Sequence, residues 1–88
     1  MERYFVYVLE STDGLRRYKG MTSDLKKRVS EHNQGHTKST KGLRPWKLVY
    51  YEEFENREEA RAREKYFKTA AGRRYLDNII GPVVQRIE

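Results

Sequence analysis

Two side chains that can do chemistry fall on a helix face that should be apolar. In RYKGMTSDLKKRVSEHN, residues 17–33, helical spacing puts Arg28 and His32 on the same side as Leu25 and Val29. Taken singly, each has a structural explanation, because a core histidine is often satisfied by its neighbours and an arginine can extend to the surface. Together, one turn apart, they indicate a candidate site on this face.

A glutamate interrupts a second apolar stripe later in the chain. Ala60, Phe67 and Ala71 follow helical spacing, and Glu64 lies among them. A carboxylate buried without a partner is strongly unfavourable, so Glu64 needs a metal ion, a cationic partner or an opening to solvent. A neighbouring arginine, or Lys68 one turn along, could satisfy it as a structural ion pair. The sequence leaves both roles open.

Two tyrosines could bring phenolic hydroxyls to the same place. Tyr7 and Tyr18 fall on two segments expected to pair as a hairpin, although tyrosine is also common in small cores. With Arg28, His32 and Glu64 they suit phosphodiester cleavage: the carboxylate can hold a divalent cation, the arginine can stabilise the phosphate, and phenols or imidazole can move protons. We predict that all five side chains line one concave pocket on one face of the sheet.

The segments that must position these residues alternate between strand and helix patterns. The run RYFVYVLES is apolar on both alternating faces, which predicts a central strand, and TDG followed by LRRYKG predicts a hairpin. The expected elements are strands at 3–11 and 15–20, a helix to about 34, a strand at 47–55, a helix to about 69 and a short helix to 80. This order, ββαβαα, predicts a single α/β domain of the α+β kind over residues 1–88, with a small three-stranded antiparallel sheet flanked by helices.

Local signals predict where the helices begin and end. Thr22 or Ser23 can cap the first helix, with Asp24 in its first turn. Asn56, with a glutamate three residues on, resembles a capping box for the next helix. We expect Gly72 to break that helix and a Gly-Pro pair to end the last one.

Residues 35–46, GHTKSTKGLRPW, show no periodicity and are expected to form a long basic loop. Loops of this length in compact domains usually carry function. We expect its cations, with one from the second strand, to form a positive rim that binds nucleic acid around the pocket: Lys38, Lys41, Arg44 and Lys19.

The composition favours a small domain that meets a polyanion. The 88 residues carry a formal net charge of +6, which is common in nucleic-acid-binding domains but can also serve only solubility. There is no cysteine, no P-loop and no HExxH motif, and no apolar stretch approaches the roughly 20 residues of a membrane span. We therefore expect a soluble, cytoplasmic protein without membrane contact.

The order and spacing of the candidate residues resemble the GIY-YIG nuclease domains, especially their small stand-alone bacterial members. The tripeptide at 5–7, FVY, matches the family's first tripeptide, and YKG at 18–20 matches the second. The next helix carries the family's R-x-x-x-H pattern as Arg28 and His32, and RPWKLVYYEEFENREEARAREKYFK resembles the third strand and the helix whose glutamate matches Glu64. The resemblance covers nearly the whole chain.

The resemblance implies Mg²⁺- or Mn²⁺-dependent hydrolysis of DNA phosphodiester bonds. By matching position, Glu64 would bind the metal and Arg28 would hold the scissile phosphate. Tyr7 would act as general base or position the water, with Tyr18 and His32 assisting.

The sequence departs from the family pattern at two places. Phe5 replaces the first glycine and adds bulk beside the site, and Lys19 replaces the second isoleucine and could add a phosphate contact. Neither change removes a catalytic group. An asparagine completes some family sites, and Asn78 is the candidate for it.

The sequence supports three kinds of function. The first is a metal-dependent endonuclease acting on DNA, with branched or damaged DNA and repair or recombination as contexts. The second is a non-catalytic nucleic-acid-binding module with an idle pocket, and the third is an adaptor that binds an acidic protein. The intact site residues favour the enzyme. Because so small a domain has little surface for reading sequence, we expect its activity alone to be weak or to need a protein partner that selects the target. We also expect a monomer.

Overall fold

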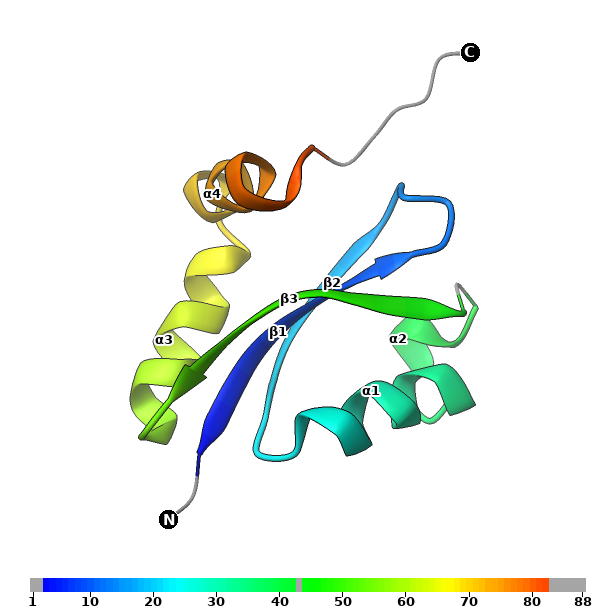
Figure 1. Cartoon of the computed structure of the whole chain (residues 1–88), viewed down its shortest axis with the longest axis horizontal. Coiled ribbons are helices and arrows are strands. Elements are labelled where there is room, and N and C mark those ends of the chain that lie inside the picture. The colour runs from blue at the N-terminus through cyan, green and yellow to red at the C-terminus, as the bar shows by residue number, and fades with distance from the viewer. Residues whose placement is uncertain (1–2, 43, 83–88) are drawn as a thin grey trace.

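A computed structural model describes residues 3–42 and 44–82 of the chain. In these ranges a three-stranded antiparallel sheet is flanked by helices (Figure 1). The elements are β1 (Tyr4–Ser11), β2 (Arg17–Thr22), α1 (Leu25–Gln34), α2 (Lys38–Lys41), β3 (Trp46–Phe54), α3 (Arg57–Phe67) and α4 (Ala70–Ile80). The predicted α+β class and the order ββαβαα are confirmed, with the single turn of α2 added. None of the helices in the described ranges is long and apolar enough to cross a membrane.

β1 is the middle strand, as its two apolar faces predicted. The strand order is β2-β1-β3, and β1 pairs antiparallel with both neighbours. Val6, Val8 and Leu9 are fully buried, and Tyr7 is 1% exposed. The side chains on both faces of β1 are therefore covered by other elements.

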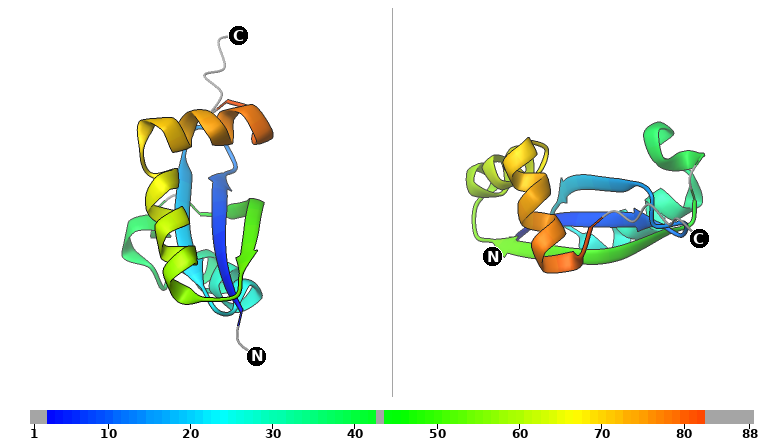
Figure 2. Two further views of the ribbon diagram at one scale, coloured as in Figure 1. Left: turned by 90° about the vertical axis from the view of Figure 1, so that its left-hand side faces the viewer. Right: turned by 90° about the horizontal axis from the view of Figure 1, so that it is seen from above.

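The helices form two layers on opposite faces of the sheet (Figure 2). Because side chains alternate along a strand, neighbouring residues of β1 belong to different layers. Under α3 and α4 lies a cluster of Val6, Val8, Ala60, Phe67 and Leu76. Under α1, on the other face, lies a cluster of Tyr7, Leu9 and Trp46, with Tyr18, Leu25, Val29 and Leu48 packed against it. The core thus consists of two small apolar clusters with the sheet between them.

The first turn of α1 corrects one prediction and that of α3 confirms another. Asp24, not Thr22 or Ser23, is the N-cap of α1, and its carboxylate accepts a hydrogen bond from an amide of the first turn at 3.1 Å. Thr22 instead accepts a hydrogen bond from the Asp24 amide at 3.1 Å. Asn56 caps α3 as expected, because its side-chain oxygen accepts the amide hydrogen of Glu59 at 2.8 Å.

The prediction that Gly72 breaks α3 is wrong, because this glycine lies in the first turn of α4. The Thr69 hydroxyl caps α4 by accepting a hydrogen bond from the Gly72 amide at 3.0 Å. A Cβ atom at position 72 would lie 1.9 Å from the carbonyl oxygen of Tyr66, so only glycine lets α4 begin this close to the end of α3. Ala71 is exposed and does not extend the apolar stripe of α3.

The segment expected to be a loop contains a helical turn. α2 covers Lys38–Lys41 and packs against α1, so the segment is partly ordered by its neighbour. Residue 43 of the expected loop lies outside the described residues. The turn places Thr40 in the interior, where it is 1% exposed.

Candidate active site

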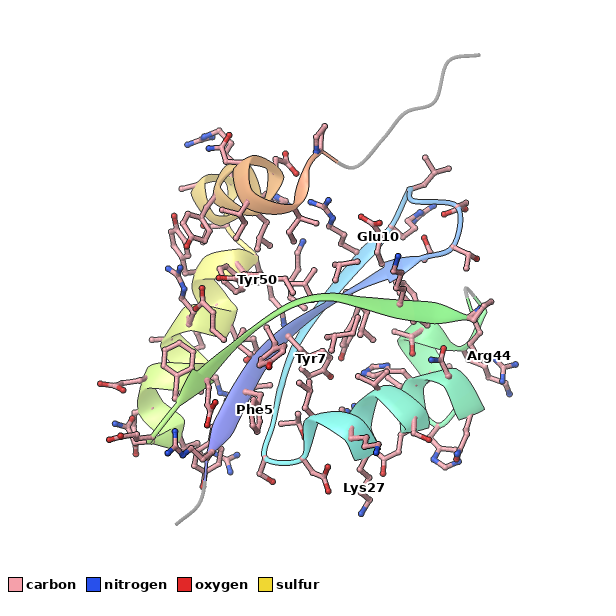
Figure 3. All side chains as sticks on the ribbon, in the orientation of Figure 1. Phe5, Tyr7, Glu10, Lys27, Arg44 and Tyr50 are labelled. Atoms are coloured by element: carbon pink, nitrogen blue, oxygen red, sulfur yellow. The ribbon has the colours of Figure 1, made fainter. Side chains whose placement is uncertain are left out.

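The hairpin and α1 bring three of the predicted site residues into contact. The Tyr7 hydroxyl lies 2.9 Å from Nε2 of His32. The ring of Tyr18 packs on the same imidazole, with 4.7 Å between the ring centroids, and the two tyrosine rings are 6.2 Å apart. Figure 3 labels Tyr7, which lies between the sheet and α1. These three aromatic side chains form one polar cluster, in which Tyr7 and His32 are buried and Tyr18 is half-buried.

Gly20 makes room for Tyr7. The two residues are directly opposite each other in the β1–β2 ladder. A Cβ atom at position 20 would lie 2.4 Å from the Tyr7 hydroxyl oxygen and 2.6 Å from its Cζ, which is too close for any side chain. A glycine inside a strand often marks such a close approach. The phenol therefore lies against the backbone of the edge strand β2.

A second hydrogen bond extends the cluster away from Tyr7. Nδ1 of His32 lies 2.8 Å from Oγ1 of Thr40, and that hydroxyl lies 3.3 Å from the carbonyl oxygen of Thr37. A carbonyl oxygen can only accept, so Thr40 donates to Thr37 and accepts the hydrogen of Nδ1. This network assigns the ring proton to Nδ1 and leaves Nε2 to accept from Tyr7. A directed chain results, Tyr7 to His32 to Thr40.

Thr40 was not foreseen from the sequence. Its carbonyl accepts a hydrogen bond from the Trp46 indole at 2.8 Å, which holds it under α1. It comes from a stretch without periodicity, so no pattern marked it. Gly20, in contrast, gave a usable signal, because an interior-strand glycine indicates close packing.

The buried cluster sets the protonation of its members. Burial raises the pKa of Tyr7 to about 12; interaction with Arg28 opposes this rise, and the neighbouring Tyr18 and Glu64 add to it. Burial also lowers the pKa of His32, helped by the charge of Arg28 and opposed by that of Glu31. At neutral pH, therefore, the phenol keeps its proton and the imidazole is neutral. This is the state in which Tyr7 can donate to His32.

Arg28 places a permanent positive charge beside the phenol. Interaction with the Tyr7 hydroxyl raises the pKa of Arg28, and a hydrogen bond to Glu31 raises it further against the opposing effect of burial. Nη1 donates to Oε1 of Glu31 at 3.1 Å, and the Arg28 side chain is 32% exposed. A guanidinium that is half-buried and still open to solvent can meet a phosphate oxygen.

Glu64 reaches this region from the opposite layer, which corrects the prediction of a single face. Its neighbours on α3, Ala60 and Phe67, belong to the cluster under α3 and α4, whereas Tyr7 belongs to the cluster under α1. α3 also contacts the edge strand β2, against whose Gly20 the phenol lies. The charge of Glu64 is felt at Tyr7 as one of the smaller contributions to its raised pKa. Both the phenol and α3 thus contact the edge strand β2.

The carboxylate of Glu64 has cationic neighbours, as one of the two predicted roles requires. Nζ of Lys68 lies 3.0 Å from Oε2, and Nη1 of Arg61 lies 3.5 Å from Oε1. Both cationic side chains are more than half exposed, at 55% and 52%. Oε1 is nevertheless buried and accepts no hydrogen bond from the described part of the chain. Ion pairs with Lys68 and Arg61 are therefore present, and Oε1 accepts no hydrogen bond from the described residues.

The geometry suits a cation held mainly by its substrate and water. In residues 3–42 and 44–82 there is no group of three or more His, Cys, Asp or Glu side chains that could form a closed metal site. Mg²⁺ is commonly bound by one or two carboxylates plus substrate phosphates and water, so a single carboxylate with an unsatisfied oxygen is compatible with it. Glu64 fits that requirement.

The cations predicted to form one rim lie on different sides of the domain. Lys38 and Lys41 are exposed on α2, and Arg44, labelled in Figure 3, is exposed just beyond it with Nε donating to the Lys41 carbonyl at 2.8 Å. Lys19 lies instead on the α4 side of β2, opposite in direction to Tyr18, so the expected continuous rim is wrong. Asn78 is exposed on α4.

The fold and the residues together define a known class of domain. The family model of the GIY-YIG catalytic domain matches residues 3–76. The chain belongs to this family, a nuclease superfamily, which confirms the resemblance read from the tripeptides and the R-x-x-x-H helix.

Individual proteins that the chain resembles belong to one group, the UPF0213 proteins. The chain is 48% identical over 65 residues to a UPF0213 protein of Clostridium perfringens, covering 73% of this chain and 69% of that protein. It is 38% identical over 77 residues to a UPF0213 protein of Staphylococcus saprophyticus, covering 86% and 93%. The solution NMR structure of a UPF0213 protein from Bacillus halodurans covers 90% of this chain and 86% of its own, with 33% identity and a TM-score of 0.55. The fold of the chain is thus similar to that of the Bacillus halodurans structure, and its sequence is similar to those of the other two UPF0213 proteins.

Proposed function

We propose that the protein is a divalent-metal-dependent endonuclease that hydrolyses phosphodiester bonds in DNA. The observation that carries this proposal is the buried chain from Tyr7 to His32 to Thr40, with links of 2.9 and 2.8 Å. It connects a phenolic hydroxyl to a neutral imidazole acceptor, which is what a general base needs in order to pass a proton on. Arg28 beside the phenol and a net charge of +6 favour a phosphate-bearing substrate.

In the proposed reaction, Tyr7 takes a proton from water while it gives its own proton to Nε2 of His32. Ionisation of Tyr7 alone is unfavourable at neutral pH because its pKa is raised to about 12, so the coupled transfer avoids a free phenolate. The water oxygen bonds to phosphorus as the bond to the leaving ester oxygen breaks, and the leaving oxygen takes a proton from solvent. Thr40 holds the imidazole so that Nε2 faces the phenol throughout.

The other site residues have positioning and electrostatic roles. Arg28 would bind the scissile phosphate and stabilise the negative charge that builds up on it, a contribution that is large in water-poor sites. Tyr18, whose ring lies 4.7 Å from that of His32, would keep the imidazole in its productive orientation. Neither role requires these residues to change protonation.

Glu64 would hold the divalent cation, Mg²⁺ or Mn²⁺. When bound, such a cation acts as a Lewis acid toward the phosphate oxygens. The exposed Lys68 and Arg61 would have to leave the carboxylate, which is inexpensive because both already lie largely in solvent. The unsatisfied Oε1 supports this role for Glu64.

Binding outside the site would use backbone contacts more than base contacts. Exposed cations on α2 and just after it would meet phosphates: Lys38, Lys41 and Arg44. Recognition of this kind responds to the shape of DNA, which suits branched or damaged DNA in repair or recombination, with a protein partner to select the target.

One observation favours a second function, a nucleic-acid-binding module without catalysis. The Glu64 carboxylate is already paired with Lys68 at 3.0 Å, as a purely structural glutamate would be. In that case the chain would bind DNA and neither cleave it nor bind a divalent cation at Glu64.

The two functions separate in a cleavage assay. The protein would be incubated with plasmid, single-stranded, flap and junction DNA in Mg²⁺, Mn²⁺ or EDTA, beside Glu64→Gln and His32→Ala variants. We expect metal-dependent cleavage of at least one substrate by wild type and none by Glu64→Gln. Tight binding of all four DNAs without cleavage in either metal would favour the module.

A further inference from the structure

A second cationic cluster lies outside the site, on the other face of β2. Arg17 and Lys19 flank Tyr18 in the strand, so their side chains point away from the tyrosine cluster and toward α4. There they line a pocket of about 90 Å³ together with Arg73, Leu76 and Asp77. The proposed nuclease reaction uses none of these residues.

Arg17 lines this pocket, and its guanidinium already has hydrogen-bond partners in the protein. Its side chain is only 4% exposed, with Nε 3.1 Å from a Glu10 oxygen and Nη1 3.0 Å from Oδ1 of Asp77. Its Nη2 also donates to the carbonyl of Gly81. Asp77 is paired with Arg17, and Lys19 and Arg73 leave the lining of the pocket with a net positive charge, so an anion is not excluded.

Lys19 and Arg73 are the unsatisfied charges. Within the described part of the chain, the ammonium of Lys19 makes no hydrogen bond or ion pair, and neither does the guanidinium of Arg73. Burial lowers the pKa of Lys19, and the positive charges of Arg73, Arg17 and Lys68 lower it further, against an opposing effect of Asp77. Lys19 is half-buried and Arg73 is exposed at the mouth of the same pocket, so an anion bound between them would offset the repulsion between these like charges.

The volume of the pocket limits which anions can bind in it. A volume of about 90 Å³ is the space of roughly three water molecules, far below the 300–1,000 Å³ of a typical small-molecule site. A phosphate group fits this scale, whereas a nucleobase or a whole nucleotide does not. The pocket lies on the same face of the sheet as α3, which carries Glu64, because its Leu76 belongs to the cluster under α3 and α4. The charge of Lys68, which pairs with Glu64 at 3.0 Å, also acts on Lys19.

We propose that Lys19 and Arg73 bind a backbone phosphate of the DNA strand being cut, adjacent to the scissile phosphate and on the α4 side of β2. This inference rests on the proposed function, because it assumes that the scissile phosphate lies at Arg28 and Glu64. The DNA strand would then cross the edge strand β2 and contact both faces of the sheet.

The chain offers a matched control for the test, since Arg74 is exposed on the same helix and does not line the pocket. The affinity of wild type, Arg73→Gln, Lys19→Gln and Arg74→Gln for a duplex oligonucleotide would be measured by fluorescence anisotropy from 50 to 200 mM NaCl in EDTA. One lost phosphate contact lowers the slope of log affinity against log salt by about 0.9, so the advantage of wild type over Arg73→Gln or Lys19→Gln should shrink about 3.5-fold across this range. Arg74→Gln should keep the wild-type slope.

Equal slopes for Arg73→Gln and Arg74→Gln would overturn the inference and leave the nuclease proposal standing if wild type still cleaves DNA. A lowered slope for Arg73→Gln in a protein that never cleaves DNA would support the phosphate site while the nuclease proposal fails. A parallel titration with inorganic phosphate, followed by amide shifts of Lys19 and Leu76 in NMR spectra, separates the two sources of the anion. Saturation by millimolar phosphate with unchanged DNA slopes would assign the pocket to a free anion and overturn the DNA proposal.

Discussion

Replacement of Glu64 by glutamine should remove metal-dependent cleavage and leave the fold almost as stable as before. The stability estimate follows from the partners of the carboxylate. Lys68 and Arg61 are 55% and 52% exposed, so each returns to solvent when the charge of Glu64 is lost. Exposed pairs of this kind contribute about 0.3–0.5 kcal/mol each, and the lower desolvation penalty of a neutral amide offsets part of that loss. We expect a change in unfolding free energy below about 1 kcal/mol.

The change in melting temperature on addition of metal distinguishes a metal-binding Glu64 from a structural one. If the cation paired with Glu64 were buried, loss of the carboxylate would strongly destabilise the fold. Both cations are exposed, however, so the melting temperature without metal does not distinguish a structural Glu64 from a metal-binding one. Binding of a cation at ten times its dissociation constant adds about 1.4 kcal/mol, which is about 6–11 °C in melting temperature for a domain of this size. Wild type should show this rise in Mg²⁺ or Mn²⁺, and Glu64→Gln should not.

Arg61→Gln is the matched control, because it removes one ion pair and keeps the carboxylate. It should retain both the metal-induced rise and cleavage of plasmid DNA. The reasoning is refuted if Glu64→Gln cleaves DNA at the wild-type rate, or if metal raises its melting temperature as much as that of wild type. Melting curves by circular dichroism and agarose-gel cleavage assays on the same protein samples decide the matter.

Four further outcomes follow from the site and the surface. Thr40→Val should strand the buried Nδ1–H of His32, with a stability loss of about 1–3 kcal/mol and slower cleavage, whereas Thr40→Ser should restore both in melts and rate assays. Gly20→Ala should displace the phenol of Tyr7, whose oxygen would lie 2.4 Å from the new methyl group, and a wild-type cleavage rate would contradict this. Burial lowers the pKa of His32 below 6.5, so the unfolded chain binds a proton more readily than the folded chain. Stability should therefore fall as pH drops through 6.5, and urea melts of His32→Gln should lack this pH dependence. The three cations near α2 are Lys38, Lys41 and Arg44. Neutralising them should lower the slope of log DNA affinity against log salt by about 0.9 per lost phosphate contact, and an unchanged slope would exclude them from the interface.

Much of the fold could be predicted because its signals are local. The double apolar alternation of β1 identified the central strand, and Asn56 with its following glutamate identified the start of α3. Gly72 was misassigned because its reason is a contact with the Tyr66 carbonyl across the α3–α4 turn, which no local propensity encodes. Thr40 was missed for the same reason, since its burial depends on α2 packing against α1.

For the site, the sequence could not predict which layer of the fold each residue belongs to. Helical periodicity correctly placed Arg28 and His32 on the sheet-facing side of α1, and Glu64 on the sheet-facing side of α3. It does not say which face of the sheet a helix covers, because that depends on how the chain crosses over between strands. The prediction of one shared face therefore failed for Glu64, and its convergence with Tyr7 stays a prediction.

The division of the core into two layers has a consequence for how activity responds to heat and denaturant. The groups proposed to move a proton, Tyr7 and His32, belong to the layer of α1, and the carboxylate of Glu64 belongs to the layer of α3 and α4, with the sheet between them. Sub-global opening of either layer would separate these groups while the rest of the chain stays folded. Cleavage should thus be lost at a lower temperature than helical signal. Native-state hydrogen exchange should report two cooperative units, one for each face of β1, with the less stable unit setting the working range of the protein.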